Sequence, residues 1–529
     1  MKTEDVAPPA EPRGRLGRAV ARVVSDGSLT KKASLNAAAS TAEQIARIVA
    51  GLIISPILLS RLGDAAFGIW QVLQSLIGHA SPASGRPGEA LKWTIAHEQR
   101  STDYDFKRRQ VGNALAVWLL FLPLLVAVGG ALAWLSPIWL DVPSGSYSTV
   151  RWAAGILVLD SVLFSLLYLP QSVLQGENLG YKRLGLSVVL VFISKSLLVV
   201  AVLMGTGIRG LAAATTVATV LWGVTYLFIV RSRVPWFGIT RSSLAEVVGF
   251  VRLSWWFLLW NLVMTIMLAS DVVVLGVVGS PGLVTTYTLA RYIPQAITVA
   301  VATVIVAIMP GLGGLIGAGE LVRAVRIRKE TMSAIWLFTI VTGTTVLLWE
   351  ESFLRLWVGE QYYPGPAAIL VVMLMVLQFA VIRTDANIID LTLNLRRKVL
   401  LGTVSAALAV GLAWFFLGEM DMGIIGLVLG FIVGRTIQSV GYPLMIGRLL
   451  GIPLERQLKG IVRPALATGI LFVGASLLST AAHAGSWPAL VLSVGMSVLV
   501  ITTIAFFAGL STGIRELLWH RLRKVARLT

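Results

Sequence analysis

Long apolar runs separated by short polar segments make up most of the chain. A run of about 20 apolar residues is long enough to cross a hydrocarbon core about 30 Å thick as a helix. The pattern predicts an all-α polytopic membrane protein with about 14 transmembrane helices. The predicted spans are 38–60, 65–83, 111–134, 151–174, 184–205, 207–230, 253–278, 283–310, 332–349, 366–393, 398–418, 423–447, 464–482 and 487–511. The second is the weakest, because His79 and Pro82 interrupt it.

The polar segments differ in charge from one side of the predicted membrane to the other. Most of the 44 Lys and Arg residues fall on the side that holds both ends of the chain. The opposite connections hold only Arg61, Arg151, Arg209 and Arg355. Since cytoplasmic flanks carry the excess of Lys and Arg, we expect both termini to be cytoplasmic.

Three of the polar segments outside the predicted spans have a predicted role. Residues 1–35 include the Pro-rich stretch APPAEP and are predicted to be a flexible cytoplasmic tail. Residues 231–252 are predicted to link two groups of helices in the cytoplasm. Residues 512–529 are basic, with apolar residues at helical spacing, and predict an amphipathic helix on the inner membrane surface.

Short motifs recur at a constant offset and predict an internal duplication. GIRGL at 207–211 returns as GIIGL at 423–427, an offset of 216 residues. The same offset joins the pairs Gly63 and Gly279, Asn178 and Asn394, and Tyr226 and Tyr442. The pattern predicts two pseudo-symmetric six-helix lobes, 36–230 and 253–447, followed by two extra C-terminal helices within 448–511. Parallel repeats of this kind are typical of transporters that bind substrate between the lobes.

The amino-acid composition excludes several classes of protein. The chain is 56% hydrophobic and 13% charged, so a soluble enzyme, a disordered regulator and a fibrous protein are excluded. It contains no cysteine and four scattered histidines, which argues against disulfides and metal sites, and we expect no bound metal or other cofactor. No Gly-Lys dipeptide is present, so there is no P-loop. The net charge of +18 is explained by anchors facing anionic lipid, and no nucleic-acid partner is expected.

Basic residues inside predicted spans are the main candidates for a binding site. A cation within the bilayer is costly and therefore indicates function. Lys195 and Arg435 lie near the midplane of their spans, and neither has an acidic residue nearby in sequence. Arg291, Arg383 and Arg47 lie within other spans. We expect these five cations to bind an anionic head group.

Acidic residues within the spans leave several pairings open. The set is Glu43, Asp160, Asp271, Asp385 and Asp390. Glu43 is expected to pair with the arginine four residues later on the same helix face. Asp271 has a depth similar to that of the arginine at 291, so the two either pair or act separately. Asp160 is the alternative partner for the midplane cations at 195 and 435. Asp271, Asp385 and Asp390 are the candidates for coupling to Na⁺ or H⁺.

Pro294 follows Arg291 by one helical turn. It removes one backbone hydrogen bond and frees the carbonyl of Ala290. Broken helices at membrane depth are tolerated where they line a cavity, whereas a packing kink is the alternative.

Three stretches carry a resemblance to a known family. They are ILLSRLGDAAFGIWQVLQSL (57–76), SDVVVLGVVGSPGLVTTYTLARYI (270–293), and LQGENLGYKR followed by GIRGLAAAT (174–215). Together they resemble polysaccharide flippases of the multidrug/oligosaccharidyl-lipid/polysaccharide exporter superfamily, in the order in which that family has them. Fourteen spans are also similar to the lipid II flippases. Arg291, in YTLAR, matches a basic position of the family, and Asp271 matches the acidic position before it.

The resemblance implies a flippase of the bacterial cytoplasmic membrane. Such a protein moves undecaprenyl-pyrophosphate-linked oligosaccharide to the outer leaflet by alternating access, for cell-surface polysaccharide biosynthesis. It implies membrane lipid as a partner, with a glycan polymerase and glycosyltransferases as further partners, and we expect a monomer. The alternatives are a multidrug cation antiporter of the same superfamily and a membrane-embedded sugar transferase or ligase. Short predicted outer loops disfavour the latter.

Overall fold

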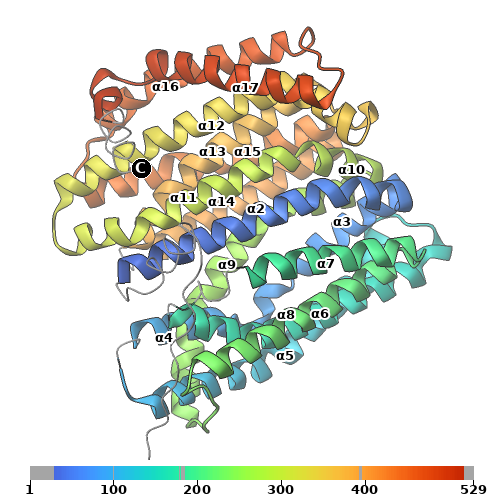
Figure 1. Cartoon of the computed structure of the whole chain (residues 1–529), viewed down its shortest axis with the longest axis vertical. Helices are drawn as coiled ribbons and strands as arrows, with labels where there is room; N and C mark the ends of the chain where they lie inside the picture. The colour runs from blue at the N-terminus through green and yellow to red at the C-terminus, as the bar shows by residue number, and fades with distance from the viewer. Residues whose placement is uncertain (1–28, 99–100, 178, 180–184, 392–395, 518–529) are drawn as a thin grey trace, which may run out of the picture.

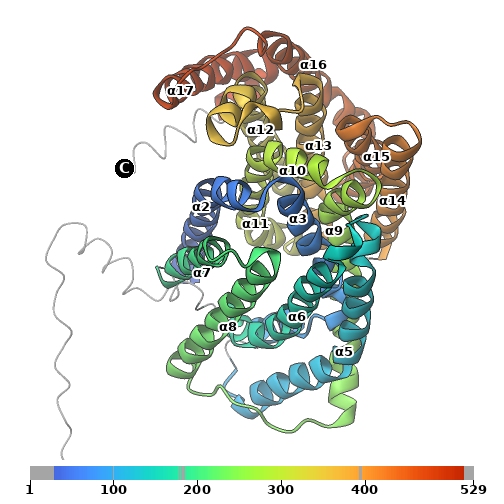
Figure 2. The same ribbon diagram turned by 90° about the vertical axis from the view of Figure 1, so that its right-hand side faces the viewer.

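The computed structural model describes residues 29–98, 101–177, 179, 185–391 and 396–517, and their regular secondary structure is entirely helical (Figures 1 and 2). In chain order the helices are α2 (Leu29–Leu62), α3 (Asp64–Gly78), η1 (Ser81–Ser84), α4 (Pro87–His97), α5 (Tyr104–Trp139), η2 (Ser144–Ser146), α6 (Tyr147–Gly176), α7 (Leu186–Leu203), α8 (Gly207–Arg233), α9 (Leu244–Val278), α10 (Pro281–Ala290), α11 (Tyr292–Gly317), α12 (Leu321–Trp357), η4 (Glu360–Tyr362), α13 (Pro366–Asp390), α14 (Arg396–Trp414), η5 (Phe415–Glu419), α15 (Gly423–Leu450), α16 (Leu454–Leu478), α17 (Trp487–Ile504) and η6 (Ala505–Gly509).

The predicted spans agree with these helices. In the described part of the chain, twelve helices are long and apolar enough to cross a membrane, and the bent pair α10–α11 adds one more. They account for every predicted span except the second. There α3 stops at Gly78, His79 caps it, and Pro82 lies in η1 before α4 begins. The two residues that weakened this prediction therefore mark a real break.

α2 and α9 begin inside segments that were predicted to be a polar tail and a polar linker. α2 starts at Leu29, within the predicted 1–35 tail, because residues 30–50 are mostly good helix formers and include no Gly or Pro. α9 starts at Leu244, within the predicted linker 231–252, because Ser243 and Glu246 form a capping box. Residues 1–28, and the end of the predicted C-terminal amphipathic helix from residue 518, lie outside the described residues.

The helices form two groups and a pair. α4 to α8 lie in the lower half of the view in Figure 1, α2 and α3 cross its middle, and α11 to α15 lie at the level of α2 and above it. α9 packs against α5 in the first group and against α14 in the second, so it ties the groups together. α16 and α17 pack against the outer side of α12, at the edge of the second group (Figure 2).

The turns before α8 and α15 have the same backbone conformation. Gly205 and Asp421, 216 residues apart, both adopt positive φ, at 71° and 50°. Gly207 and Gly423 follow at 58° and 56°. Glycine adopts this left-handed conformation readily, and Asp421 is the one of the four with a side chain. The pair Gly63 and Gly279 differs, with φ of 76° and −94°. The duplication therefore stays a prediction. Tyr226 and Tyr442 are both buried, whereas the pair Asn178 and Asn394 lies outside the described residues.

Packing differs between the two ends of the helix bundle. We call the end where α2 meets α3 and α9 meets α10 the hairpin end. Here a single apolar core includes Trp70 of α3, Tyr287 of α10 and Phe431 of α15. At the opposite end the first group has its own core, around Leu91 of α4. The second group has another, around Ile389 of α13. The two groups are therefore joined at the hairpin end and packed separately at the other.

Candidate functional site

A cavity of about 450 Å³ lies between the two groups of helices. This volume is within the range of about 300–1,000 Å³ that is usual for small-molecule sites. Its walls come from α2, α3, α7, α10 and α11. The lining residues are Gln44, Arg47, Ile48, Gly51, Ile54, Ser55, Leu58, Phe67, Trp70, Gln71, Gln74, Lys195, Leu198, Thr288, Leu289, Arg291, Tyr292, Gln295, Ala296 and Val299. We call it the interlobe cavity.

Cations and amides supply the polar surface of the interlobe cavity. Three of the five predicted cations, Arg47, Lys195 and Arg291, line it, and none of the described lining residues is acidic. Four glutamines add groups that both donate and accept hydrogen bonds. Trp70 and Tyr292 add aromatic rings, each with an apolar face and one polar atom. The cavity is therefore suited to a ligand that combines negative charge with many hydroxyl groups.

Arg47 and Lys195 differ in whether a carboxylate lies close enough to offset their charge. Arg47 lies 2.7 Å from Glu43 on the same helix, which confirms the predicted ion pair. Its guanidinium also lies 5.4 Å from the centre of the Trp222 ring. Lys195, by contrast, makes no hydrogen bond or ion pair with any described residue. It is the cation of this cavity whose charge is not offset by a carboxylate.

Arg291 occupies the break in the α10–α11 span. The two helices bend by 52° where α10 ends at Ala290 and α11 begins at Tyr292. Pro294 lacks the N–H that would bond the carbonyl of Ala290, which explains why the helix breaks here. Of the two alternatives left open by the sequence, the structure has the broken helix that lines a cavity. The break turns the Arg291 side chain toward both the cavity and α9.

Arg291 and Asp271 form a buried ion pair that joins α11 to α9. The Tyr287 hydroxyl donates to the same carboxylate over 2.7 Å. Arg291 also donates to the carbonyl of Leu268 at 3.3 Å and to the amide oxygen of Gln295 at 3.0 Å. Of the two alternatives left open by the sequence, the structure has the paired one. The pair fixes the arginine at the cavity wall and partly neutralises it.

Polar contacts close the interlobe cavity at the hairpin end. Thr285 of α10 donates to the backbone carbonyl of Asp64 at 2.7 Å. The Tyr362 hydroxyl, from the turn before α13, donates to the Asp64 carboxylate. Burial and this hydrogen bond raise the pKa of Tyr362, so its hydroxyl remains a donor at neutral pH. A Cβ on Gly68 would lie 2.0 Å from the carbonyl oxygen of Pro281, so α3 and α10 approach as closely as a glycine allows.

The remaining predicted cations, Arg435 and Arg383, lie inside the second group of helices. Arg435 donates to the carbonyl of Met267, and its guanidinium lies 5.2 Å from the Phe431 ring centre. Arg383 contacts the sulfur of Met264 at 3.5 Å. Neither lines the interlobe cavity. Depth along a helix was readable from sequence, but the face toward which each side chain points was not.

Asp385 and Asp390, predicted as coupling sites, are held in ion pairs. Arg328 donates two hydrogen bonds of 2.8 Å to Asp385. Lys398 lies 2.5 Å from Asp390 and 3.5 Å from the centre of the Trp260 ring. Both carboxylates are therefore neutralised by cations from other helices. Their part in coupling to Na⁺ or H⁺ stays a prediction.

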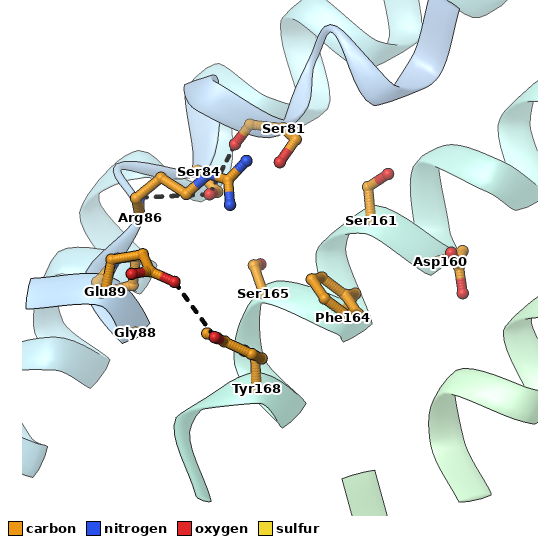
Figure 3. Close-up of a pocket in the computed structure, with 11 residues that line it drawn as sticks. Ser81, Ser84, Arg86, Gly88, Glu89, Asp160, Ser161, Phe164, Ser165 and Tyr168 are labelled. Atoms are coloured by element: carbon orange, nitrogen blue, oxygen red, sulfur yellow. Dashed lines mark hydrogen bonds between the residues drawn. The ribbon is translucent and has the colours of Figure 1, made fainter. Parts of the chain in front are cut away.

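A second, smaller cavity of about 120 Å³ lies within the first group, between α6 and the segment that joins α3 to α4 (Figure 3). Ser81 and Ser84 lie beside Arg86 in this view, Ser161 and Ser165 lie across from it on α6, and Tyr168 bonds Glu89 at 3.2 Å. Asp160 lies at its edge and forms no ion pair within the described residues, so it is not the partner of Lys195 or Arg435.

Arg86 also links this small cavity to α9. It donates to the amide oxygen of Asn261 at 2.6 Å. Nearby, Ser75 donates to the carbonyl of Ala269 at 2.8 Å. These contacts give the broken α3–α4 segment a structural role at the interface with α9.

The arrangement of the helices is similar to that of several solved membrane proteins. No protein-family model matches the sequence, and a search of curated proteins finds no relative. Among solved structures, the chain is similar to an inward-facing multidrug resistance MATE family transporter of the MOP superfamily, with a TM-score of 0.64 and 16% identity over 77% of this chain and 98% of that one.

The chain is also similar to the lipid II flippase MurJ in an inward closed conformation, with a TM-score of 0.62 and 13% identity. That match covers 89% of this chain and 98% of the flippase. The match to the flippase covers more of this chain than the match to the inward-facing MATE transporter does. The additional length is comparable to that of the α16–α17 hairpin. An outward-facing MATE family transporter matches with a TM-score of 0.54 and 14% identity over 80% of this chain and 96% of that one.

Proposed function

We propose that this protein is a flippase that moves polyprenyl-pyrophosphate-linked oligosaccharide across the bacterial cytoplasmic membrane. The observation that carries the proposal is the lining of the interlobe cavity, where three cations face a volume without a described acidic residue. An anionic head group would gain from such a site, because charges interact strongly where water is scarce. Since the ion pairs of Arg47 and Arg291 offset their charge, Lys195 is the principal anion ligand.

The other lining residues suit the carbohydrate part of this substrate. Gln44, Gln71, Gln74 and Gln295 would exchange hydrogen bonds with sugar hydroxyls, since each amide offers both donors and acceptors. Tyr292, which is partly exposed, would pack against the apolar face of a sugar ring. The polyprenyl chain would stay in lipid, because each buried methylene favours the hydrocarbon by about 0.8 kcal/mol.

Alternating access would follow from closing one end of the bundle and opening the other. By the distribution of Lys and Arg, the hairpin end faces outward and both termini face the cytoplasm. The substrate would enter from the cytoplasmic side, and release would need the contacts of Asp64 with Thr285 and Tyr362 to break. Outward movement of negative charge is favourable in an inside-negative cell, by about 2.3 kcal/mol per charge per 100 mV.

A multidrug transporter is the second candidate, and the likeness to the inward-facing MATE structure favours it. Its substrates would be cations, for which a wall of cations is unfavourable. The described lining residues offer such substrates glutamines and aromatic rings but no carboxylate. For this reason the flippase is the primary proposal.

Transport in proteoliposomes distinguishes the two candidates. The full chain would be reconstituted with a fluorescent polyprenyl-pyrophosphate disaccharide, and a membrane-impermeant quencher would report the fraction that changes leaflet. We expect flipping by the unaltered protein and at least a tenfold loss in Lys195→Ala, because the unpaired cation is removed. Ethidium uptake, measured in parallel, should be absent.

Arg209→Ala is the matched control for this experiment. Arg209 is an exposed cation near the start of α8 that bonds Thr149 at 2.6 Å and does not line the interlobe cavity. It should leave the flipping rate unchanged. Ethidium transport without any movement of the glycolipid would overturn the flippase proposal in favour of the multidrug transporter.

A further inference from the structure

Three charged residues that meet where α9, α15 and the α10–α11 break come together do not balance in charge. Asp271 and Arg435 are 3% and 4% exposed, and Arg291 reaches the same cluster from the helix break. One carboxylate therefore serves two guanidinium groups, and the cluster has a formal net charge of +1. The charge lies within helices that cross the membrane, where an unpaired ion is costly.

The hydrogen bonds of Asp271 leave Arg435 without a carboxylate. One Asp271 oxygen accepts from the backbone N–H of Val272 at 2.9 Å. The other accepts from Tyr287 and Arg291. Arg435 donates only to the carbonyl of Met267, and its Nε is buried with no hydrogen-bond partner. A buried N–H of a charged group is costly when unsatisfied, which indicates a missing acceptor.

A small cavity lies at this place. It has a volume of about 20 Å³ and is lined by Arg291, Arg435 and Asp271, with Gln295 and Thr298 as further polar groups. A single water needs at least about 10–15 Å³, so the space holds one water or one monoatomic ion. A phosphate with its four oxygens is too large. The cavity is therefore distinct from the interlobe cavity in size, although Arg291 and Gln295 line both.

We propose that this cavity binds a chloride ion between Arg291 and Arg435. A halide would bring the cluster to neutrality and accept from the Arg435 Nε, whereas water would leave the charge uncompensated. A cation would face two guanidinium groups and only one carboxylate, whose oxygens are already engaged. The proposal holds whether the protein moves a glycolipid or a drug, because it does not depend on the interlobe ligand.

Thermal unfolding of the purified full chain in detergent tests the site. Sodium chloride would be titrated against sodium gluconate at constant total salt. A ligand that binds only the folded state raises the unfolding midpoint in a saturable way. We expect such a rise with chloride for the unaltered protein and for Lys195→Gln, which changes the interlobe cavity alone. Arg435→Gln should abolish the chloride-dependent shift.

Arg383→Gln is the matched control. Arg383 is also a largely buried arginine with an unsatisfied Nε, but the cavity beside it is only about 10 Å³, too small for an ion. Its chloride-dependent shift should equal that of the unaltered protein. Equal midpoints in chloride and gluconate for the unaltered protein would overturn the proposal, as would a shift that Arg435→Gln retains.

Bromide provides a second measurement that does not depend on the variants folding. Crystals of the unaltered protein grown in bromide should show an anomalous peak between Arg291 and Arg435. Absence of a peak there, or density that is only water, would contradict the chloride site. Flipping that fails while the peak is present would count against the proposed function and not against this site.

Discussion

The two ends of the helix bundle are built from the same kind of helices and packed in opposite ways. At the hairpin end, α3 and α10 touch with Gly68 against Pro281, and one apolar core runs through both groups. At the opposite end, each group closes on a core of its own. Helices that share no core can separate without exposing apolar side chains that were buried together. The contrast identifies the hairpin end as closed and the opposite end as the one that can part.

The polar contacts follow the same division. Asp64 joins α3 to α10 and to the turn before α13, and it does so through one backbone and one side-chain acceptor. Hydrogen bonds contribute only about 0.5–1.5 kcal/mol each, so such a closure holds but can be reversed. A closure made of a few weak bonds over a close helix contact is suited to a transporter that must open again.

The largest expected effect comes from adding a methyl group where α3 meets α10. In Gly68→Ala the new Cβ would lie 2.0 Å from the Pro281 carbonyl oxygen, and backbone on both sides must move. We expect flipping to fall to background, because the hairpin end no longer closes. Gly78→Ala is the control on the same helix, since its Cβ would meet no atom within 4 Å.

Spin labels give a structural readout for this pair. The chain has no cysteine, so two introduced cysteines on α3 and α10 would be the only labelled positions. The distance between them should lengthen in Gly68→Ala and stay the same in Gly78→Ala. Unchanged distances and normal transport in Gly68→Ala would show that the close approach is not needed.

A smaller effect is expected from Tyr362→Phe. The change removes the hydrogen bond to the Asp64 carboxylate and nothing else from the ring. The loss of about 1 kcal/mol should shift the balance between closed and open hairpin ends about fivefold. The same spin-label pair measures the populations. Tyr363→Phe is the control, because that hydroxyl interacts with Ser479 of the α16–α17 hairpin instead, and it should leave the populations unchanged.

The smallest effect concerns the opposite end, where α9 begins. Two hydrogen bonds from Ser243, from its backbone N–H and its hydroxyl, lower the pKa of Glu246. Because the folded pKa is below the unfolded value, this stabilisation is present above about pH 4.3 and is lost as pH falls through the folded value. Glu246→Ala should therefore speed hydrogen exchange in the first turn of α9 at pH 7, with the difference shrinking in acid. Ser243→Ala should act likewise, and exchange that neither variant alters would show that the capping box is not needed.

The membrane spans could be predicted from the sequence because hydrocarbon thickness imposes a minimum apolar length. The second predicted span was the weakest because His79 and Pro82 interrupt it, and the structure has a helix break at these two residues. The i, i+4 pair of Glu43 and Arg47 was also predictable, since a helix fixes its geometry.

Contacts between distant helices could not be predicted in this way. Asp64 and Tyr362 are almost 300 residues apart, and each is an ordinary residue of a turn or helix start when taken alone. Arg328, the partner of Asp385, lies in a segment predicted as a polar loop. The depth of Lys195 and of Arg435 along their helices could be predicted from the sequence. Only Lys195 lines the interlobe cavity, because helix packing determines which side chains face it.

A structure of the full chain with a bound polyprenyl-pyrophosphate disaccharide tests the anionic cavity most directly. We expect the phosphates to lie within ion-pair distance of Lys195, with Arg291 beside them and the sugars against Tyr292. A head group found outside the space between the two groups of helices, or phosphates turned away from Lys195, would contradict the proposed site.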